Sequence, residues 1–231
     1  MSFVEKILPY ERELFLWLNG YHTPYWDVFM WIYGSKLIWL PLIVIALIIF
    51  TYKIKWKEAV LILICAVLIG ILCDYVSAQL IKPFFERLRP TYHPDFKQFV
   101  DTVNGYRGGR YGFISNHAAN GFGVVAFTSL LFRYKYLTIT LILWATITAY
   151  SRIYLGVHFI SDVVGGAIWG TFIGVIIYYV YLTSRRYILK VPEYQLKTPI
   201  YSKNRANILI AVIIATILFI AIFSVFFNIP S

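Results

Sequence analysis

The chain has 231 residues, of which 60% are hydrophobic and only 14% are charged. This balance excludes an ordinary soluble domain and indicates an integral membrane protein. The net charge of +10 could suggest a nucleic-acid partner, but the basic residues lie in short connections between apolar runs, which is typical of membrane topology. We therefore predict a single all-α domain over residues 1–231, a polytopic membrane helical bundle that binds membrane lipids and no nucleic acid.

The first 36 residues are predicted to form an interfacial segment. Residues 3–18 mix apolar and charged side chains, which makes them too polar to span a bilayer, and they lack the basic start of a signal peptide. We expect an interfacial helix there. The aromatic residues that follow are dense enough to mark the level of the lipid headgroups; they are Tyr21, Tyr25, Trp26, Trp31, Tyr33 and Trp39.

Six apolar runs then approach the roughly 20 residues that a spanning helix needs. They lie at residues 37–52, 59–81, 117–132, 137–156, 159–182 and 207–227. The connections near Lys53, near Arg133 and from 185 to 205 are rich in basic residues, which favours the cytoplasmic side for all three. Six spans then place both termini outside, together with the connection 82–114 and the corner at Gly156.

Two patterns inside these runs predict packing rather than chemistry. Gly166, Gly170 and Gly174 recur every four residues, so they form a helix face that another helix can approach closely. Cys65 and Cys73 would lie about 12 Å apart on one helix, which is too far for a disulfide. We expect both cysteines to be core residues.

The first chemically unusual segment ends the second apolar run. Lys82 and Arg89 are seven residues apart, so on a helix both cations would point the same way, and Pro90 would end the helix. Two fixed cations at a membrane surface suit a phosphate group. The alternative for either residue alone is snorkelling to lipid headgroups.

A second segment opens the third run. Ser115 or Asn116 is a natural N-cap, so the free N–H groups and the positive dipole end of the following helix would face the outer side and could bind phosphate. His117 would lie where a proton donor can reach a leaving group. Taken singly, His117 could equally be a capping or packing residue.

The third segment combines Ser151 and Arg152 with His158 and Asp162 between two apolar runs. His158 and Asp162 are four residues apart, so they share a helix face if Asp162 lies in the first turn of the next helix. A carboxylate that holds one imidazole nitrogen leaves the other free as a nucleophile or base. The alternative is a buried ion pair that ties two helices together.

The three segments together indicate displacement at phosphorus, where catalysis is chiefly positioning and charge neutralisation. The scheme requires no metal and no cofactor, since the possible ligands are two histidines and one aspartate beside several cations. Asp74 is about 12 Å of helix before Lys82, and we expect it to be a structural partner for an interior polar group.

In order and spacing, the segments resemble the three signature motifs of the type 2 phosphatidic acid phosphatase superfamily, integral-membrane lipid phosphatases that share a helical core with vanadium haloperoxidases. The first motif is matched at Lys82, Arg89 and Pro90. The second, proline-serine-glycine-histidine, is matched only at Ser115 and His117. The third is matched at all four positions: Ser151, Arg152, His158 and Asp162. The similarity covers roughly residues 59–182.

The resemblance implies a double-displacement phosphatase. His158 would attack phosphorus and form a phosphohistidine, Asp162 would orient it, and His117 would protonate the leaving oxygen and later activate water. The residues expected to bind phosphate are Lys82, Arg89, Ser115, Asn116 and Arg152.

The second motif departs from the family pattern at two positions, Ile114 for proline and Asn116 for glycine. Asparagine tolerates positive backbone angles better than most residues, so we expect the backbone of Asn116 to keep its contact with phosphate. By the same resemblance, some bacterial lipid A phosphatases also carry a histidine-alanine-alanine-asparagine run like that at His117–Asn120.

We therefore predict a lipid phosphatase in a bacterial inner membrane, with its active site facing the periplasm or exterior and its lipid phosphate substrate arriving from the bilayer. Undecaprenyl diphosphate is the first choice of substrate, followed by phosphatidylglycerophosphate and lipid A phosphate. Two other classes stay open: a proton-coupled transporter, which would spread titratable residues through the depth of the spans, and a non-catalytic phospholipid-binding relative. The oligomeric state is left open.

Overall fold

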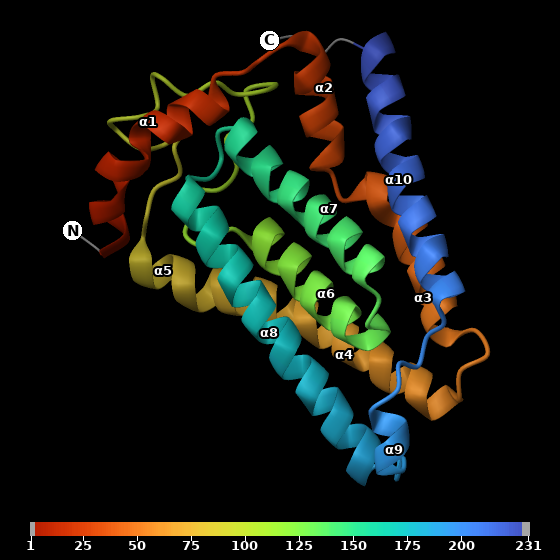
Figure 1. Ribbon diagram of the computed structural model, residues 1–231. Coiled ribbons are helices and arrows are strands. Elements are labelled where there is room, and N and C mark those ends of the chain that lie inside the picture. The colour runs from red at the N-terminus through yellow and green to blue at the C-terminus, as the bar shows by residue number, and fades with distance from the viewer. Residues whose placement is uncertain (1–2, 228–231) are drawn as a thin grey trace.

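The computed structural model describes residues 3–227, which form an antiparallel bundle of helices without a β-strand in that range (Figure 1). This confirms the predicted all-α class. The helices are α1 (Leu8–Asn19), α2 (Pro24–Tyr33), α3 (Leu40–Thr51), α4 (Trp56–Val76), α5 (Lys82–Phe85), α6 (Asn116–Phe132), α7 (Lys135–Tyr154), α8 (Ile160–Tyr187), α9 (Glu193–Leu196) and α10 (Lys203–Phe226). Shorter turns are the 3₁₀ segments η1 (Phe3–Ile7) and η2 (Leu37–Trp39) and the π-helical turn η3 (Ser77–Ile81).

Each of the six predicted apolar runs coincides with a helix. Three stretches are long and apolar enough to cross a membrane, namely Trp56–Phe85, Ile160–Tyr187 and Lys203–Phe226. Helices α2 and α3 together make a fourth, which is bent by 63° at residues 34–36. Helices α6 and α7 do not meet the same criteria of length and hydropathy. The protein is a multi-pass membrane protein, and the count of six spans stays a prediction.

The N-terminal segment is helical as predicted, but part of its aromatic set lies in the core. Tyr33 and Trp39 are buried on either side of the α2–α3 bend. The Tyr33 hydroxyl donates to the Trp144 carbonyl in α7 at 3.1 Å, and the Trp39 indole N–H donates to the Tyr33 carbonyl at 2.9 Å. The sequence did not predict this burial, which arises because α7 offers both an apolar surface and a carbonyl acceptor. Tyr21 and Trp26 are exposed.

Helices α6 and α8 pack closely through the glycine face of α8. A side chain at Gly166 would meet the Ser115 carbonyl, and one at Gly170 would meet the Ala119 backbone. Gly174 lies in the same way against Gly123. This confirms the predicted packing face, and it also brings the beginnings of α6 and α8 together. Both free cysteines are buried, as expected for core residues.

The contact at Gly170 makes a testable prediction about stability. Gly170→Ala places a methyl group against the Ala119 backbone, so we expect a loss of about 1–3 kcal/mol and a lower melting temperature in detergent. Gly70→Ala in α4 is the matched control, because nothing lies within 4 Å of its added carbon. Alanine there should be neutral or stabilising. Equal melting temperatures for the two variants would contradict the close helix contact.

The two ends of the bundle differ in chemistry. The three basic connections, α3–α4, α6–α7 and α8–α10, lie at one end, and the loop 86–115 and the corner 155–159 lie at the other (Figure 1). This matches the predicted grouping of the connections. At the basic end, Arg185 pairs with Glu58 at 2.7 Å and joins α8 to α4.

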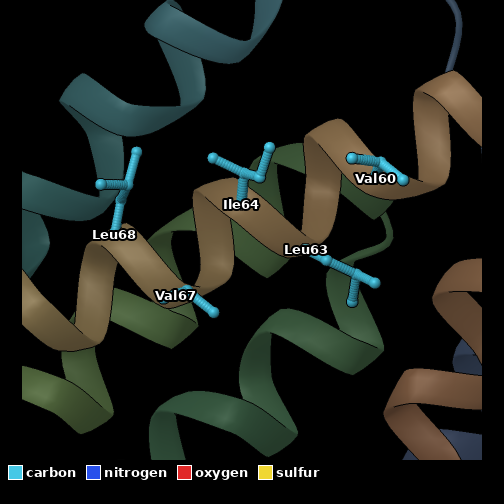
Figure 2. A pocket seen from close by; sticks show the side chains of 5 residues that line it. All are labelled: Val60, Leu63, Ile64, Val67 and Leu68. Atoms are coloured by element: carbon cyan, nitrogen blue, oxygen red, sulfur yellow. The ribbon is translucent and has the colours of Figure 1, made fainter.

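The flank of α4 between the two ends is apolar. Figure 2 shows a shallow groove there that is lined only by aliphatic side chains. The lining residues are Val60, Leu63, Ile64, Val67 and Leu68. A surface of this kind suits contact with acyl chains.

Candidate active site

The loop 86–115 brings Arg89 to the site. Helix α5 ends at Phe85, because Glu86 adopts a left-handed conformation with φ of 46°. Lys82 and Arg89 therefore do not lie on one helix, and that expectation was wrong. The chain instead turns back on itself: the Arg89 amide donates to the Arg110 carbonyl at 3.0 Å, and the Gly112 amide donates to the Arg87 carbonyl at 2.8 Å. The long loop is thus folded over the site rather than extended.

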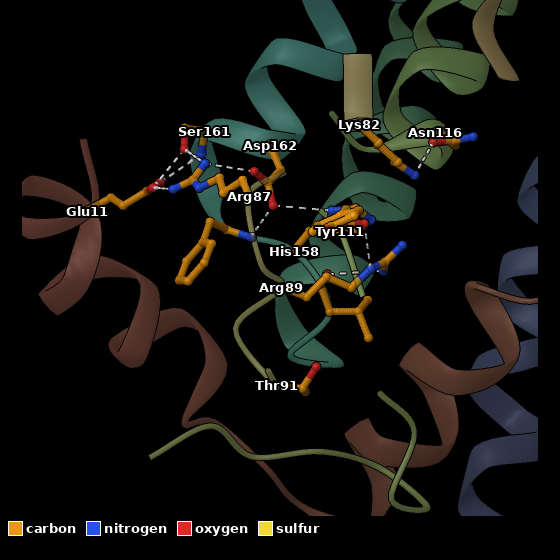
Figure 3. A network of polar contacts seen from close by, with 12 residues as sticks. Glu11, Lys82, Arg87, Arg89, Thr91, Tyr111, Asn116, His158, Ser161 and Asp162 are labelled. Atoms are coloured by element: carbon orange, nitrogen blue, oxygen red, sulfur yellow. Dashed lines mark hydrogen bonds and ion pairs between the residues drawn. The ribbon is translucent and has the colours of Figure 1, made fainter. Parts of the chain in front are cut away.

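Within the described part of the chain, the Arg89 side chain is held by carbonyl groups alone. Its Nε donates to Tyr111 and its terminal nitrogen to Val157, both at 3.2 Å (Figure 3). None of the ion pairs found among residues 3–227 includes Lys82, Arg89 or Arg152. Their positive charges are therefore available to an anion.

Lys82 is oriented by a chain of amide side chains. It follows the π-helical turn η3 and donates to Asn116 Oδ1 at 2.6 Å. Asn116 in turn donates to Asp74 Oδ1 at 3.0 Å, and Asn120 donates to the same oxygen at 2.7 Å. Asp74 is therefore the structural partner that we expected.

Asn116 has a side-chain role that the sequence did not predict. It is the first residue of α6, and it is absent from the residues with positive φ in the described range. Its helical backbone is the ordinary one for that position. The replacement of glycine has supplied a side chain that links Lys82 to Asp74.

The beginning of α6 has the geometry predicted for anion binding. Ser115 is the N-cap and is fully buried, yet its hydroxyl has no hydrogen-bond partner within residues 3–227. The Ser115 amide donates to the Asp162 carbonyl at 2.9 Å, which ties α6 to the first turn of α8. The next N–H groups of α6 have no partner in their own helix.

Arg152 is the most enclosed of the three cations, with 4% of its surface exposed. Its Nε and one terminal nitrogen donate to Ser151 Oγ at 3.1 and 3.0 Å, and that hydroxyl donates to the Thr148 carbonyl. Its guanidinium group lies so close to Gly34, at the α2–α3 bend, that a side chain there would displace it. The glycine and the serine therefore fix where the charge points.

His158 and Asp162 meet as predicted. Asp162 lies in the first turn of α8, and its Oδ2 is 3.4 Å from His158 Nδ1 and accepts from the Phe159 amide at 3.0 Å. Both side chains are buried. Burial lowers the pKa of His158 well below the usual 6.5, and the positive charges of Arg89, Lys82 and Arg152 lower it further. The imidazole is therefore neutral at physiological pH, as a nucleophile must be.

The predicted residues converge. His158 is close enough to Lys82, Arg89 and Arg152 for their charges to act on it, and His117 interacts in the same way with Arg152, His158 and Arg89. Residues from the three separate segments thus lie near one another at one end of the bundle.

Sequence reasoning missed the group on the other side of Asp162. The fully buried Arg87 donates to Asp162 Oδ1 at 2.7 Å and to Glu11 of α1 at 2.5 Å (Figure 3). Arg87 lies between Glu86 and Leu88 and is followed by Arg89, so the local sequence contained no signal that it would be the buried one. Glu11 follows the helical spacing of the buried residues Leu8 and Phe15. Lys36, beside the α2–α3 bend, was also missed, and its charge acts on His117.

The charges around His158 predict how the rate depends on pH. Because cations disfavour the imidazolium, removing one in Arg89→Gln should raise the pKa of His158, so the acid limb of kcat/KM should move to higher pH by up to about one unit. Rate profiles of both enzymes on the same lipid phosphate test this, because the ionisation of the substrate is common to both. An acid limb at the same pH in both enzymes would show that His158 does not set it.

Comparison with known proteins gives consistent matches. A sequence model of the PAP2 superfamily matches residues 58–186. A lipid A 4'-phosphatase of Porphyromonas gingivalis is 44% identical over 182 residues, covering 79% of this chain and 77% of that protein. A second one, from Bacteroides thetaiotaomicron, is 38% identical and covers 77% and 79%. An undecaprenyl-diphosphatase of Sulfolobus acidocaldarius is 32% identical, covering 63% and 65%.

Among solved structures, Aquifex aeolicus LpxE superimposes with a TM-score of 0.52 at 26% identity. The match covers 75% of this chain and 94% of that one. The similarity therefore includes most of the bundle around the site.

Proposed function

Because the chain belongs to the PAP2 superfamily and is a membrane lipid phosphatase, we propose that it removes a phosphate group from a lipid A-type glycolipid through a phosphohistidine intermediate. The observation that carries the mechanism is the convergence of the unpaired cations on the His158–Asp162 pair. The two relatives of highest identity given above support the choice of lipid. Undecaprenyl diphosphate, the first choice from sequence, becomes the second candidate, supported by the more distant archaeal relative.

In the first step, His158 Nε2 attacks phosphorus while Nδ1–H faces Asp162. The bond between phosphorus and the leaving oxygen breaks. His117, which takes up a proton once the bound phosphate anion offsets the nearby cations, donates the proton that this oxygen needs. Lys82, Arg89, Arg152 and the beginning of α6 neutralise the charge that develops on the other phosphoryl oxygens. The products of this step are the dephosphorylated lipid and phosphohistidine.

In the second step, water attacks the phosphohistidine. His117, now neutral, takes a proton from the water, the P–N bond breaks, and inorganic phosphate leaves with His158 restored. The same residue thus acts first as general acid and then as general base. The unpaired hydroxyl of Ser115 is a further donor to phosphoryl oxygen.

The position of the site suits a substrate that stays in the bilayer. The site lies at the end of the bundle opposite the basic connections. By the positive-inside tendency this end faces the periplasm or the exterior of an inner membrane. A lipid can then present its phosphate sideways, while its acyl chains remain in hydrocarbon.

The test is a panel of lipid phosphates assayed side by side with purified enzyme in detergent, with a chelator present. We expect phosphate release from lipid A, and mass spectrometry of the product should show loss of one phosphoryl group. Release from undecaprenyl diphosphate alone would move the substrate to the second candidate. No release from any lipid would favour the non-catalytic alternative, and loss of activity on chelation would contradict a metal-independent reaction.

A further inference from the structure

The carboxylate of Asp162, which orients the nucleophile, is itself held by Arg87 on the side away from His158. The two oxygens of Asp162 have separate partners: Oδ2 faces His158 and the Phe159 amide, and Oδ1 accepts from Arg87 at 2.7 Å. Asp162 and Arg87 are both wholly buried at their side chains. With one oxygen fixed by a charged hydrogen bond, the carboxylate cannot rotate away from the imidazole without losing that bond.

Arg87 is in turn fixed by the N-terminal helix. Its second terminal nitrogen donates to Glu11 Oε1 at 2.5 Å, and its first also donates to Ser161 Oγ at 2.6 Å. Glu11 completes the network, since its Oε2 accepts from the Ser161 amide at 2.8 Å and its Oε1 accepts from the Ser161 hydroxyl at 2.7 Å. Figure 3 shows this closed set of contacts between α1, the loop and the first turn of α8.

The arrangement of charge explains why both partners are needed. Arg87 lies between two carboxylates, and its planar group stacks at 4.6 Å over the ring of Phe159. A buried guanidinium keeps one geometry only when its hydrogen bonds are satisfied on both sides. Glu11 also accepts from an N–H in the first turn of α8, which places that turn as well.

We propose that Arg87 and Glu11 are positioning residues for the nucleophile, which act through Asp162 to hold His158 in line with phosphorus. This inference rests on the proposed phosphohistidine mechanism. It also gives the N-terminal helix, which lies outside the matched residues 58–186, a part in the reaction that does not require contact with substrate.

The test uses Glu11→Gln, Arg87→Lys and the control Glu13→Gln in full-length protein in detergent. Glu13 is an exposed carboxylate two residues along the same helix. We expect kcat per folded molecule to fall roughly 10- to 100-fold for the first two variants, the range of one hydrogen bond to a charged group. KM should change less than about 2-fold, since neither residue contacts phosphate. Glu13→Gln should match the wild type.

A measurement without turnover complements the rates. Orthovanadate adopts the five-coordinate geometry of the transition state and can bond to the nucleophilic nitrogen, whereas inorganic phosphate binds without that bond. We expect Glu11→Gln to weaken orthovanadate about 10-fold, with little change in phosphate affinity. This comparison stays informative if Arg87→Lys folds poorly.

Two outcomes would overturn the proposal: wild-type kcat and vanadate affinity in both variants, or weakened binding of vanadate and phosphate to the same extent. The second result would indicate a general structural role. His158→Ala separates this failure from failure of the proposed function. An active His158→Ala would remove the phosphohistidine mechanism itself, whereas an inactive one beside a fully active Glu11→Gln would remove only the positioning role.

Discussion

Replacing His158 with alanine is expected to lower phosphate release by about 10⁴-fold or more, because it removes the nucleophile that forms the covalent intermediate. The protein should still fold, since His158 lies in the corner between α7 and α8 rather than inside a helix contact. The measurement is phosphate release per folded molecule, together with acid-quenched trapping of labelled phosphoenzyme. Only the wild type should show the label.

The chain offers a matched control for that experiment. His22 forms a shorter pair with Asp27, at 2.7 Å, and its other nitrogen is 3.1 Å from the Tyr154 carbonyl. This pair has the same chemistry, but neither residue belongs to the proposed phosphate site. His22→Ala should therefore keep turnover per folded molecule. If it abolished turnover and His158→Ala did not, the assignment of the nucleophile would be wrong.

Arg152→Met is expected to lower turnover about 10²- to 10³-fold, because it removes a preorganised donor to the phosphoryl oxygens. It should also change how the protein responds to ligand. A buried cation with no carboxylate partner is costly until an anion arrives, so orthovanadate should raise the melting temperature of the wild type strongly. In Arg152→Met most of that increase should disappear.

The control for Arg152 is a methionine at Arg133, which lies at the opposite end of the bundle and donates to the Lys197 carbonyl and the Tyr178 hydroxyl. Arg133→Met should lower the melting temperature somewhat but keep the full increase on adding vanadate. If vanadate stabilised Arg152→Met as much as the wild type, Arg152 would be a packing residue rather than part of the phosphate site.

The third motif shows what short-range spacing in the sequence can predict. The spacing of His158 and Asp162 predicted that they would meet in the first turn of a helix, and they do. The N-cap at Ser115 and the structural role of Asp74 were also correct. In each case the relevant geometry is set within one or two helical turns, or the polar group had few possible partners in an apolar surrounding.

The features that the sequence did not predict depend instead on contacts between distant parts of the chain. Lys82 and Arg89 were placed on one helix because the spacing allowed it, but the helix ends at Phe85, and pairing of the loop with Tyr111 and Arg110 decides the position of Arg89. For Asn116 the sequence suggested only a backbone contact with phosphate, and the side-chain hydrogen bonds with Lys82 and Asp74 were not predicted. Both outcomes depend on contacts between residues far apart in the chain.

By itself, the sequence determined the class of fold. It also supplied the chemical groups of the proposed site and their order along the chain, because apolar run length and short-range spacing follow from helix geometry alone. Only the tertiary structure decided that Glu11 and Arg87 stand behind Asp162 and that the α2–α3 bend closes on Arg152. The physical reason is that a buried charge must find a partner, and which partner it reaches depends on helix packing across more than 70 residues of chain.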